Sequence, residues 1–181
     1  VYTRPWERVL FWEERDANPF FHLFEALWMI MGRNDLKFIS AFNSNMGRYS
    51  DDGVTLNAAY GYRWRQHFRY DQLTEIANAL SANPDCRRQV LSMWDAWGDL
   101  GSDSLDLPCN THAYFQRDEL GSLDMMVTNR SNDLIWGAYG ANAVHFSVLQ
   151  EYMAAKIGCD IGKYWQTSFN THIYHDPHLS L

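Results

Sequence analysis

Apolar residues between positions 20 and 31 recur at steps of three and four, and this spacing predicts a helix. Asn18 is the expected N-terminal cap, and Pro19 stands in the first turn, where its missing N–H leaves no helical hydrogen bond unmade. The side chains at the repeated positions are expected to form the buried face: Phe20, Leu23, Phe24, Leu27 and Met31.

Three more segments have helical spacing. Helices are predicted over residues 35–46, 70–81 and 143–157, the last of which ends at a glycine. Residues 59–64 combine aromatic side chains with glycine and are predicted to form a loop. Residues 1–16 are expected to form an opening strand or arm.

Alternation of polar and apolar residues predicts β-strands over residues 87–94, 111–116 and 123–128, and a further strand is expected at 164–168. The short link at 119–122 indicates a hairpin between the second and third strands. Helices interleaved with such strands are typical of the α/β (α+β) class with a mixed sheet. The whole chain, 1–181, is long enough for a single well-buried domain.

The composition limits the classes of function. A net charge of −7 argues against a general affinity for nucleic acid, and no stretch reaches the ~20 apolar residues that cross a membrane. Three scattered cysteines form no disulfide framework, which favours a cytoplasmic, reducing location. A metal site in the histidine-rich tail is an alternative, but no metal is predicted because His172, His175 and His178 lack a known ligand spacing.

Cys109 is the strongest candidate for chemistry. It follows Pro108 and precedes the polar cluster at 129–133, which contains an arginine, by about 20 residues. A guanidinium beside a thiol favours the thiolate, which is the nucleophilic form. The alternative is a buried core thiol, and this is the expected state of Cys86 and Cys159.

Six motifs, in one order, resemble the thymidylate synthase family. They are Phe-Glu-Ala-Leu-Trp at 24–28, Tyr-Gly-Tyr-Arg-Trp-Arg at 60–65, Asp-Cys-Arg-Arg at 85–88, Leu-Pro-Cys at 107–109, Arg-Ser-Asn-Asp at 130–133 and His-Ile-Tyr at 172–174. The resemblance implies a large, bent, mixed sheet with helices on one side. It also implies a homodimer packed through the other faces of the two sheets.

The resemblance further implies transfer of a one-carbon unit from 5,10-methylene-tetrahydrofolate, a co-substrate, to C5 of a pyrimidine nucleotide 5′-monophosphate. Cys109 matches the nucleophile that adds to C6 of the ring. Glu25 and Tyr60 match the groups that handle protons, Glu25 through ordered water and Tyr60 as a relay. Arg130 matches the arginine that contacts both the phosphate and the nucleophile, and Ser131 matches its partner on the phosphate.

Other matched positions concern binding. Arg87 and Arg88 match a pair that reaches into the neighbouring subunit's site. Asp133 matches the aspartate that contacts folate, and Gly137 matches the glycine that lets the pterin approach closely. His172 and Tyr174 match the pair that holds the sugar 3′-hydroxyl.

The chain departs from the family pattern in several places. Asn110 stands where the family usually has histidine, and residues 136–142 contain one residue more than the family motif. Asn142 is therefore the choice for the residue that reads the base, with Ala141 at the ungapped position. An amide there favours uracil, whereas relatives that read cytosine carry an aspartate. Residues 46–49 replace a tryptophan-rich shield, and its loss would let water capture the intermediate.

Three functions therefore stay open. Methylation of dUMP to dTMP is the first expectation, and 5-hydroxymethylation of dUMP, dCMP or CMP is the alternative. A catalytically inactive nucleotide-binding dimer is the third. The chain is also expected to lack the family's arginine-bearing loop before Val1 and its closing segment after Leu181.

Overall fold

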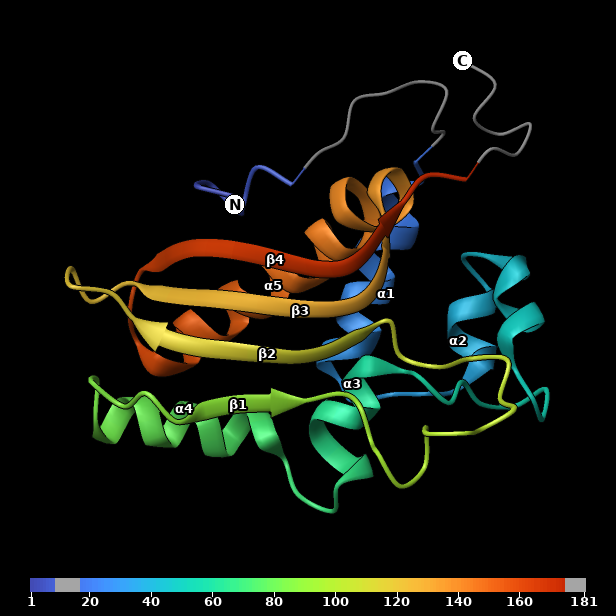
Figure 1. Cartoon of the computed structure of the whole chain (residues 1–181), viewed down its shortest axis with the longest axis horizontal. Helices are drawn as coiled ribbons and strands as arrows, with labels where there is room; N and C mark the ends of the chain where they lie inside the picture. The colour runs from blue at the N-terminus through green and yellow to red at the C-terminus, as the bar shows by residue number, and fades with distance from the viewer. Residues whose placement is uncertain (9–16, 175–181) are drawn as a thin grey trace.

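The computed structural model describes residues 1–8 and 17–174 (Figure 1). The α-helices are α1 (Pro19–Ile30), α2 (Leu36–Ser40), α3 (Tyr60–Tyr62), α4 (Gln72–Ala82) and α5 (Asn142–Ile157). Shorter or wider helical turns are η2 (Ser44–Tyr49), η3 (Arg63–His67) and η4 (Leu134–Ala141). The strands are β1 (Gln89–Ser92), β2 (Asn110–Arg117), β3 (Leu123–Asp133) and β4 (Ile161–His172).

The four strands form one mixed sheet in the order β1-β2-β3-β4. The first three run antiparallel, whereas β3 and β4 are parallel and are joined through η4 and α5. Helices α4 and α5 lie against one face of the sheet, and α1 packs against α5 (Figure 1). The mixed sheet confirms the predicted α+β class, and the turn between Arg117 and Leu123 confirms the predicted hairpin.

The core lies between this sheet and the helices. Its largest fully buried apolar side chains are Trp64, Tyr164, Phe146, Ile39, Leu73, Leu80, Leu91, Met93, Leu123, Met125 and Leu149. Such burial is the main favourable term in folding. Within the described residues, no helix is both long and apolar enough to cross a bilayer.

Helix α1 confirms its predicted cap but buries a different face. The Asn18 side chain accepts a hydrogen bond from the Phe21 amide at 3.0 Å. The predicted buried face is wrong, because Phe20 is 69% exposed and Leu23, Leu27 and Met31 are exposed as well, while Phe24 is half-buried. The buried positions are His22, Ala26, Trp28 and Met29. Apolar residues occur on both faces of this helix, so their spacing alone does not identify the buried one.

Other boundaries also differ from the sequence expectations. The predicted loop at 59–64 is helical, as α3 and η3, because its side chains pack into the core. The helix predicted at 35–46 ends at Ser40 and is followed by η2. In the predicted opening arm, Tyr2 pairs with Tyr164 of β4, and residues 9–16 lie outside the described residues.

Candidate active site

A cavity of about 160 Å³ lies where α1, α3 and α5 meet the segment before β2. Three residues that the sequence singled out, Glu25, Tyr60 and Cys109, line it together. Its other polar lining comes from Asp106 and His145. The apolar lining consists of Trp28, Met29, Met46, Leu56, Ala58, Ala59 and Leu107. Helical and loop segments far apart in sequence therefore bring a thiol and several proton-carrying groups into one small space.

The surroundings of Cys109 match the predicted electrostatic setting. Nη2 of Arg130 lies 3.9 Å from the Cys109 Sγ. The same guanidinium donates to the carbonyl oxygens of Leu107 at 3.1 Å and Pro108 at 2.8 Å, which fixes it beside the thiol. The guanidinium of Arg130 is therefore held in place beside the Cys109 sulfur.

Tyr60 supports the same segment from inside the cavity. Its hydroxyl oxygen accepts hydrogen bonds from the amides of Cys109 and Asn110, both at 3.1 Å. Desolvation, together with the neighbouring Cys109, raises the pKa of Tyr60. The hydroxyl therefore keeps its proton at neutral pH and has it available for a ligand.

Glu25 and His145 form a pair at the inner end of the site. Oε2 of Glu25 lies 2.9 Å from Nε2 of His145, and His145 is only 6% exposed. At this distance Nε2 still makes no hydrogen bond of normal geometry to any described residue. His22 stands nearby, and ligand atoms of His22, Glu25 and His145 lie within 4.8 Å of one another, a donor set suited to a metal ion.

Sequence reasoning did not single out His145 or Asp106. His145 stands three residues after Asn142 on α5, so it shares that residue's side of the helix. Asp106 stands three residues before Cys109 and accepts a hydrogen bond from the Ala58 amide at 2.7 Å. Desolvation raises the pKa of the Asp106 carboxyl. Their spacing to predicted site residues is the only sequence signal that points to them.

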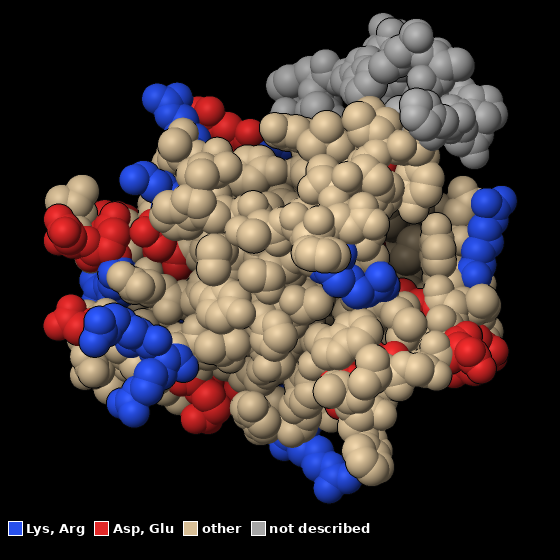
Figure 2. Space-filling model, viewed as in Figure 1, with Lys and Arg blue, Asp and Glu red and all other residues tan. Residues whose placement is uncertain are grey.

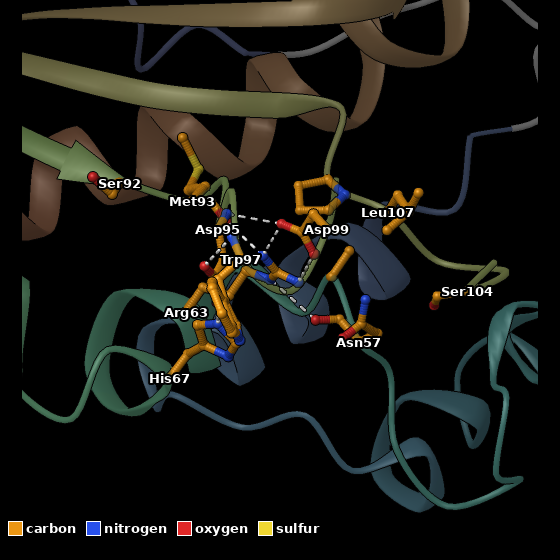
Figure 3. A network of polar contacts seen from close by, with 12 residues as sticks. Asn57, Arg63, His67, Ser92, Met93, Asp95, Trp97, Asp99, Ser104 and Leu107 are labelled. Atoms are coloured by element: carbon orange, nitrogen blue, oxygen red, sulfur yellow. Dashed lines mark hydrogen bonds and ion pairs between the residues drawn. The ribbon is translucent and has the colours of Figure 1, made fainter. Parts of the chain in front are cut away.

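A fully buried ion pair supports the segment that leads to Cys109 (Figure 3). Arg63 donates to the two carboxylate oxygens of Asp99 at 2.6 and 2.8 Å. It also donates to the carbonyl oxygens of Met93 at 2.8 Å and Asn57 at 3.0 Å. The network ties η3 to the loop after β1, and this loop continues to the nucleophile.

Asn142 belongs to a chain of side-chain amides next to the nucleophile. Its Nδ2 donates to Asn132 at 2.9 Å, and its Oδ1 accepts from Asn110 at 3.1 Å. Asn110 in turn accepts from Asn129, and Asn132 donates to Gln166 at 2.9 Å. These contacts fix which end of the Asn142 amide is donor and which is acceptor. Asn142 therefore presents an oriented amide beside the nucleophile, which its neighbour Ala141 cannot supply.

Asp133 and His172 are paired neighbours at the ends of β3 and β4. One carboxylate oxygen of Asp133 caps η4 by accepting from the amides of Ile135 and Trp136. The buried Oδ2 of Asp133 and the buried Nδ1 of His172 have no hydrogen-bond partner within residues 1–8 and 17–174. Buried polar atoms of this kind are rare unless a ligand or water pairs with them.

The remaining predicted residues lie around this edge. The ring of Tyr174 stands edge-on to that of His172, with centroids 4.9 Å apart. Ser131 pairs in register with Asn170 of β4. Gly137 admits no side chain, because a Cβ there would stand 2.3 Å from the Asn132 side-chain oxygen. The backbone of η4 can therefore come close to the amide chain only at a glycine.

Arg87 and Arg88 are not part of this cavity. Both are exposed just before β1, and Arg87 lines a shallow hollow on the outer face of the sheet together with Tyr114, Met126 and Trp165. The middle of the face drawn in Figure 2 carries few charged side chains, while arginine, lysine and acidic residues gather at its rim.

Comparison with known proteins gives concordant matches. The family model described as "Thymidylate synthase" matches residues 19–180. A protein of Pseudomonas phage M6 named deoxyuridylate hydroxymethyltransferase is 63% identical over 176 residues, which cover 97% of this chain and 50% of the relative. Proteins of the same name from Bacillus phage SP01 and Delftia phage PhiW-14 are 39% and 30% identical, over 98% and 95% of this chain and 49% and 50% of their own lengths.

The chain thus spans about half the length of the curated relatives it matches. Two solved structures share the fold: thymidylate synthase from T4 phage, with a TM-score of 0.74 at 23% identity, and thermostable thymidylate synthase A from Bacillus subtilis, with 0.73 at 24%. The matched parts cover 87% and 85% of this chain, and 59% and 57% of the two structures.

Proposed function

Because the chain belongs to the thymidylate synthase family, we propose that it transfers a one-carbon unit to C5 of dUMP and releases 5-hydroxymethyl-dUMP. The observation that carries the proposal is the cavity in which Cys109, Tyr60 and Glu25 meet. The choice of product follows the names of the three phage relatives. It replaces methylation to dTMP, the first expectation from the sequence, with what was its alternative.

In this proposal Cys109 adds to C6 of the pyrimidine, and the electron pair moves to C5 and O4. Arg130 supports the addition because its guanidinium is held beside the sulfur that attacks the ring. Tyr60 keeps its proton and holds the backbone of the nucleophile, so it is placed to pass a proton at the ring. Covalent addition divides one difficult substitution at C5 into easier steps.

The nucleotide would be held by residues around the same edge. Arg130 and Ser131 suit a 5′-phosphate, because a guanidinium and a hydroxyl both donate to its oxygens. Asn142 presents an amide whose orientation is fixed by Asn110 and Asn132, which suits the donor and acceptor pattern of uracil. His172 and Tyr174 would contact the sugar 3′-hydroxyl, and the unpaired Nδ1 of His172 is available for it.

The residues at the ends of β3 and β4 fit 5,10-methylene-tetrahydrofolate. The unpaired, buried Oδ2 of Asp133 can accept from an N–H of a pterin ring, and Gly137 lies four residues further on, within η4. When bound, this co-substrate supplies the one-carbon unit. Asp133 and Gly137 would orient it against the nucleotide.

The cavity wall supports a hydroxymethyl rather than a methyl product. The segment that replaces the family's tryptophan-rich shield lies within η2, and from it Met46 reaches the cavity while Tyr49 is 51% exposed. A flexible methionine covers less of a reactive carbon than a ring would. Water can then add to the one-carbon unit after its transfer.

We also propose that the active unit is a homodimer that packs through the outer sheet face. That face exposes apolar side chains such as Val90, Tyr114 and Met126, which suit an interface. Arg88 lies outside the chain's own cavity and would complete the partner's phosphate site. Mixing inactive Cys109→Ser and Arg88→Ala chains should then restore part of the activity. No recovery under conditions of demonstrated subunit exchange would contradict shared sites.

Mass spectrometry of the product tests the proposed reaction. The chain is incubated with methylene-tetrahydrofolate and one nucleotide in each of four separate reactions, which contain dUMP, dCMP, UMP or CMP. The expected result is the mass shift of a hydroxymethyl group on dUMP alone. A methyl mass shift would return the assignment to thymidylate synthesis, and no covalent change on any nucleotide would favour an inactive binding dimer.

A further inference from the structure

We propose that His145, paired with Glu25, is the base that deprotonates the water molecule which becomes the hydroxymethyl oxygen. This inference rests on the proposed function and deepens it, because it assigns the step that separates a hydroxymethyl from a methyl product. Neither the sequence motifs nor the names of the relatives assign a role to His145.

The position of His145 carries the proposal. It is 6% exposed, lines the same cavity as Cys109, and lies with Nε2 2.9 Å from the Glu25 carboxylate. That nitrogen has no hydrogen bond of normal geometry among the residues that the structure describes. A buried nitrogen that lines the cavity beside a carboxylate is suited to accept a proton from a water molecule that the carboxylate helps to hold.

The step balances without an oxidant or reductant. Before it, the nucleotide carries a C6–S bond to Cys109 and a methylene group at C5 that is conjugated with the C4 carbonyl. The water oxygen forms a bond to the methylene carbon, one water proton passes to His145, and the electron pair of the methylene double bond moves to O4. When C4=O re-forms, the C5=C6 bond forms and the C6–S bond breaks, which releases the Cys109 thiolate.

The protons are also accounted for. Two protons end on the two nitrogens that had carried the one-carbon unit, one from C5 of the pyrimidine and one from water by way of His145. Methyl formation would instead need a hydride in place of water. His145 therefore acts only on the water branch, after the C5 proton has left.

Asp106 is the rival base, because it lines the same cavity. Its Oδ2 already accepts from the Ala58 amide at 2.7 Å, whereas Nε2 of His145 has no hydrogen bond of normal geometry among the described residues. A metal ion on His22, Glu25 and His145 is the second rival, since such an ion could activate water itself. Both rivals give different results in the experiment below.

The experiment follows the fate of the methylene intermediate. The full chain converts dUMP tritiated at C5 in the presence of methylene-tetrahydrofolate and 2-mercaptoethanol, whose thiol competes with water for the methylene carbon. In His145→Gln the ratio of thioether to hydroxymethyl product should rise at least about tenfold, since a general base contributes roughly 10²–10⁴-fold. Tritium release, which reports loss of the C5 proton, and dUMP affinity should stay within about threefold of wild type.

Controls separate the rivals. His112→Gln makes the same change on β2 outside the cavity lining and should leave the ratio unchanged, as should Asp106→Asn and dialysis of the wild type against EDTA. A rise in Asp106→Asn, or a rise on chelation that zinc reverses, would overturn the role of His145. His145→Asn provides a second variant in case His145→Gln does not fold.

The outcomes distinguish this inference from the proposed function. A wild type that makes only methyl product overturns the proposed function. A wild type that makes hydroxymethyl product, with an unchanged ratio in both His145 variants, overturns the role of His145 alone. A parallel fall in tritium release and in both products would show a purely structural role and would also overturn it.

Discussion

Two buried polar clusters differ in how fully the protein satisfies their hydrogen bonds. Around Arg63 and Asp99 the guanidinium donates to both carboxylate oxygens and to two backbone carbonyls (Figure 3). At the candidate site, His145 Nε2, Asp133 Oδ2 and His172 Nδ1 have no hydrogen bond within the described part of the chain. The first cluster holds the backbone in place, while the second keeps bonding capacity that a substrate or water can use.

A single unpaired atom does not identify a site. Nε1 of Trp64 and Oε1 of Gln150 also lack a partner among the described residues, and both belong to the core. What distinguishes His145 is that its unpaired atom lines a cavity together with a thiol that has a guanidinium beside it. The comparison therefore predicts losses of activity at one cluster and losses of stability at the other.

The largest effect on activity should come from Cys109. Cys109→Ser removes the nucleophile, so kcat for product formation should fall by roughly 10³-fold or more, while nucleotide affinity stays within about threefold. Steady-state assays and calorimetric titration with dUMP measure the two quantities. Cys159→Ser, outside the cavity lining, is the matched control and should keep activity. Near wild-type turnover in Cys109→Ser would remove this residue from the mechanism.

The largest effect on stability should come from Arg63. Arg63→Met leaves the carboxylate of Asp99 buried without its partner, which should lower the free energy of unfolding by about 3–5 kcal/mol. The double variant Arg63→Met/Asp99→Leu should recover much of that loss, because it buries no unpaired charge. Urea denaturation measures both. A loss below about 1 kcal/mol in the single variant would mean that water reaches the pair.

The sequence predicted the class of fold and singled out three residues that the structure brings to one cavity, for identifiable reasons. Cys109 and Arg130 could be predicted because their motifs lie in order, and register pairing in the hairpin then brings them together. The buried face of α1 could not be predicted, because its spacing marks an apolar stripe that is exposed in the structure. His145 has only its spacing to Asn142 as a local signal, since its role depends on α5 packing against α1 beside Glu25.

A smaller change of specificity is expected at Asn142. Asn142→Asp places a carboxylate against the side-chain oxygen of Asn132, which now accepts from the amide at 2.9 Å. A mismatched buried polar group costs about 1–3 kcal/mol, so kcat/KM for uracil relative to cytosine nucleotides should fall roughly tenfold to a hundredfold. Competition assays with dUMP and dCMP give the ratio. An unchanged ratio would transfer base reading to the backbone around Ala141.

The smallest expected effect sharpens the comparison, because it is a gain in stability from removing an ionisable group of the site. Desolvation raises the pKa of Asp106, so the folded chain favours the protonated carboxyl more than the unfolded chain does. The stability that the Asp106 carboxyl contributes is therefore fully present below its pKa in the unfolded chain, about 3.9. This stability is lost as pH rises through the raised pKa of the folded chain. The Asp106→Asn variant does not lose stability in this way, because an amide does not ionise, and it keeps an acceptor for the Ala58 amide.

Asp106→Asn should consequently raise the free energy of unfolding at pH 7 by about 1 kcal/mol, and the gain should disappear near the unfolded pKa of about 3.9. Urea denaturation across this pH range measures it. Asp51 is the matched control with the opposite sign: hydrogen bonds from the Leu105 amide and Ser104 lower its pKa, so its contribution is present at neutral pH and lost in acid. Asp51→Asn should therefore destabilise the chain at pH 7. A stability loss in Asp106→Asn as well would show that the cavity carboxyl supports the fold, as Asp99 does.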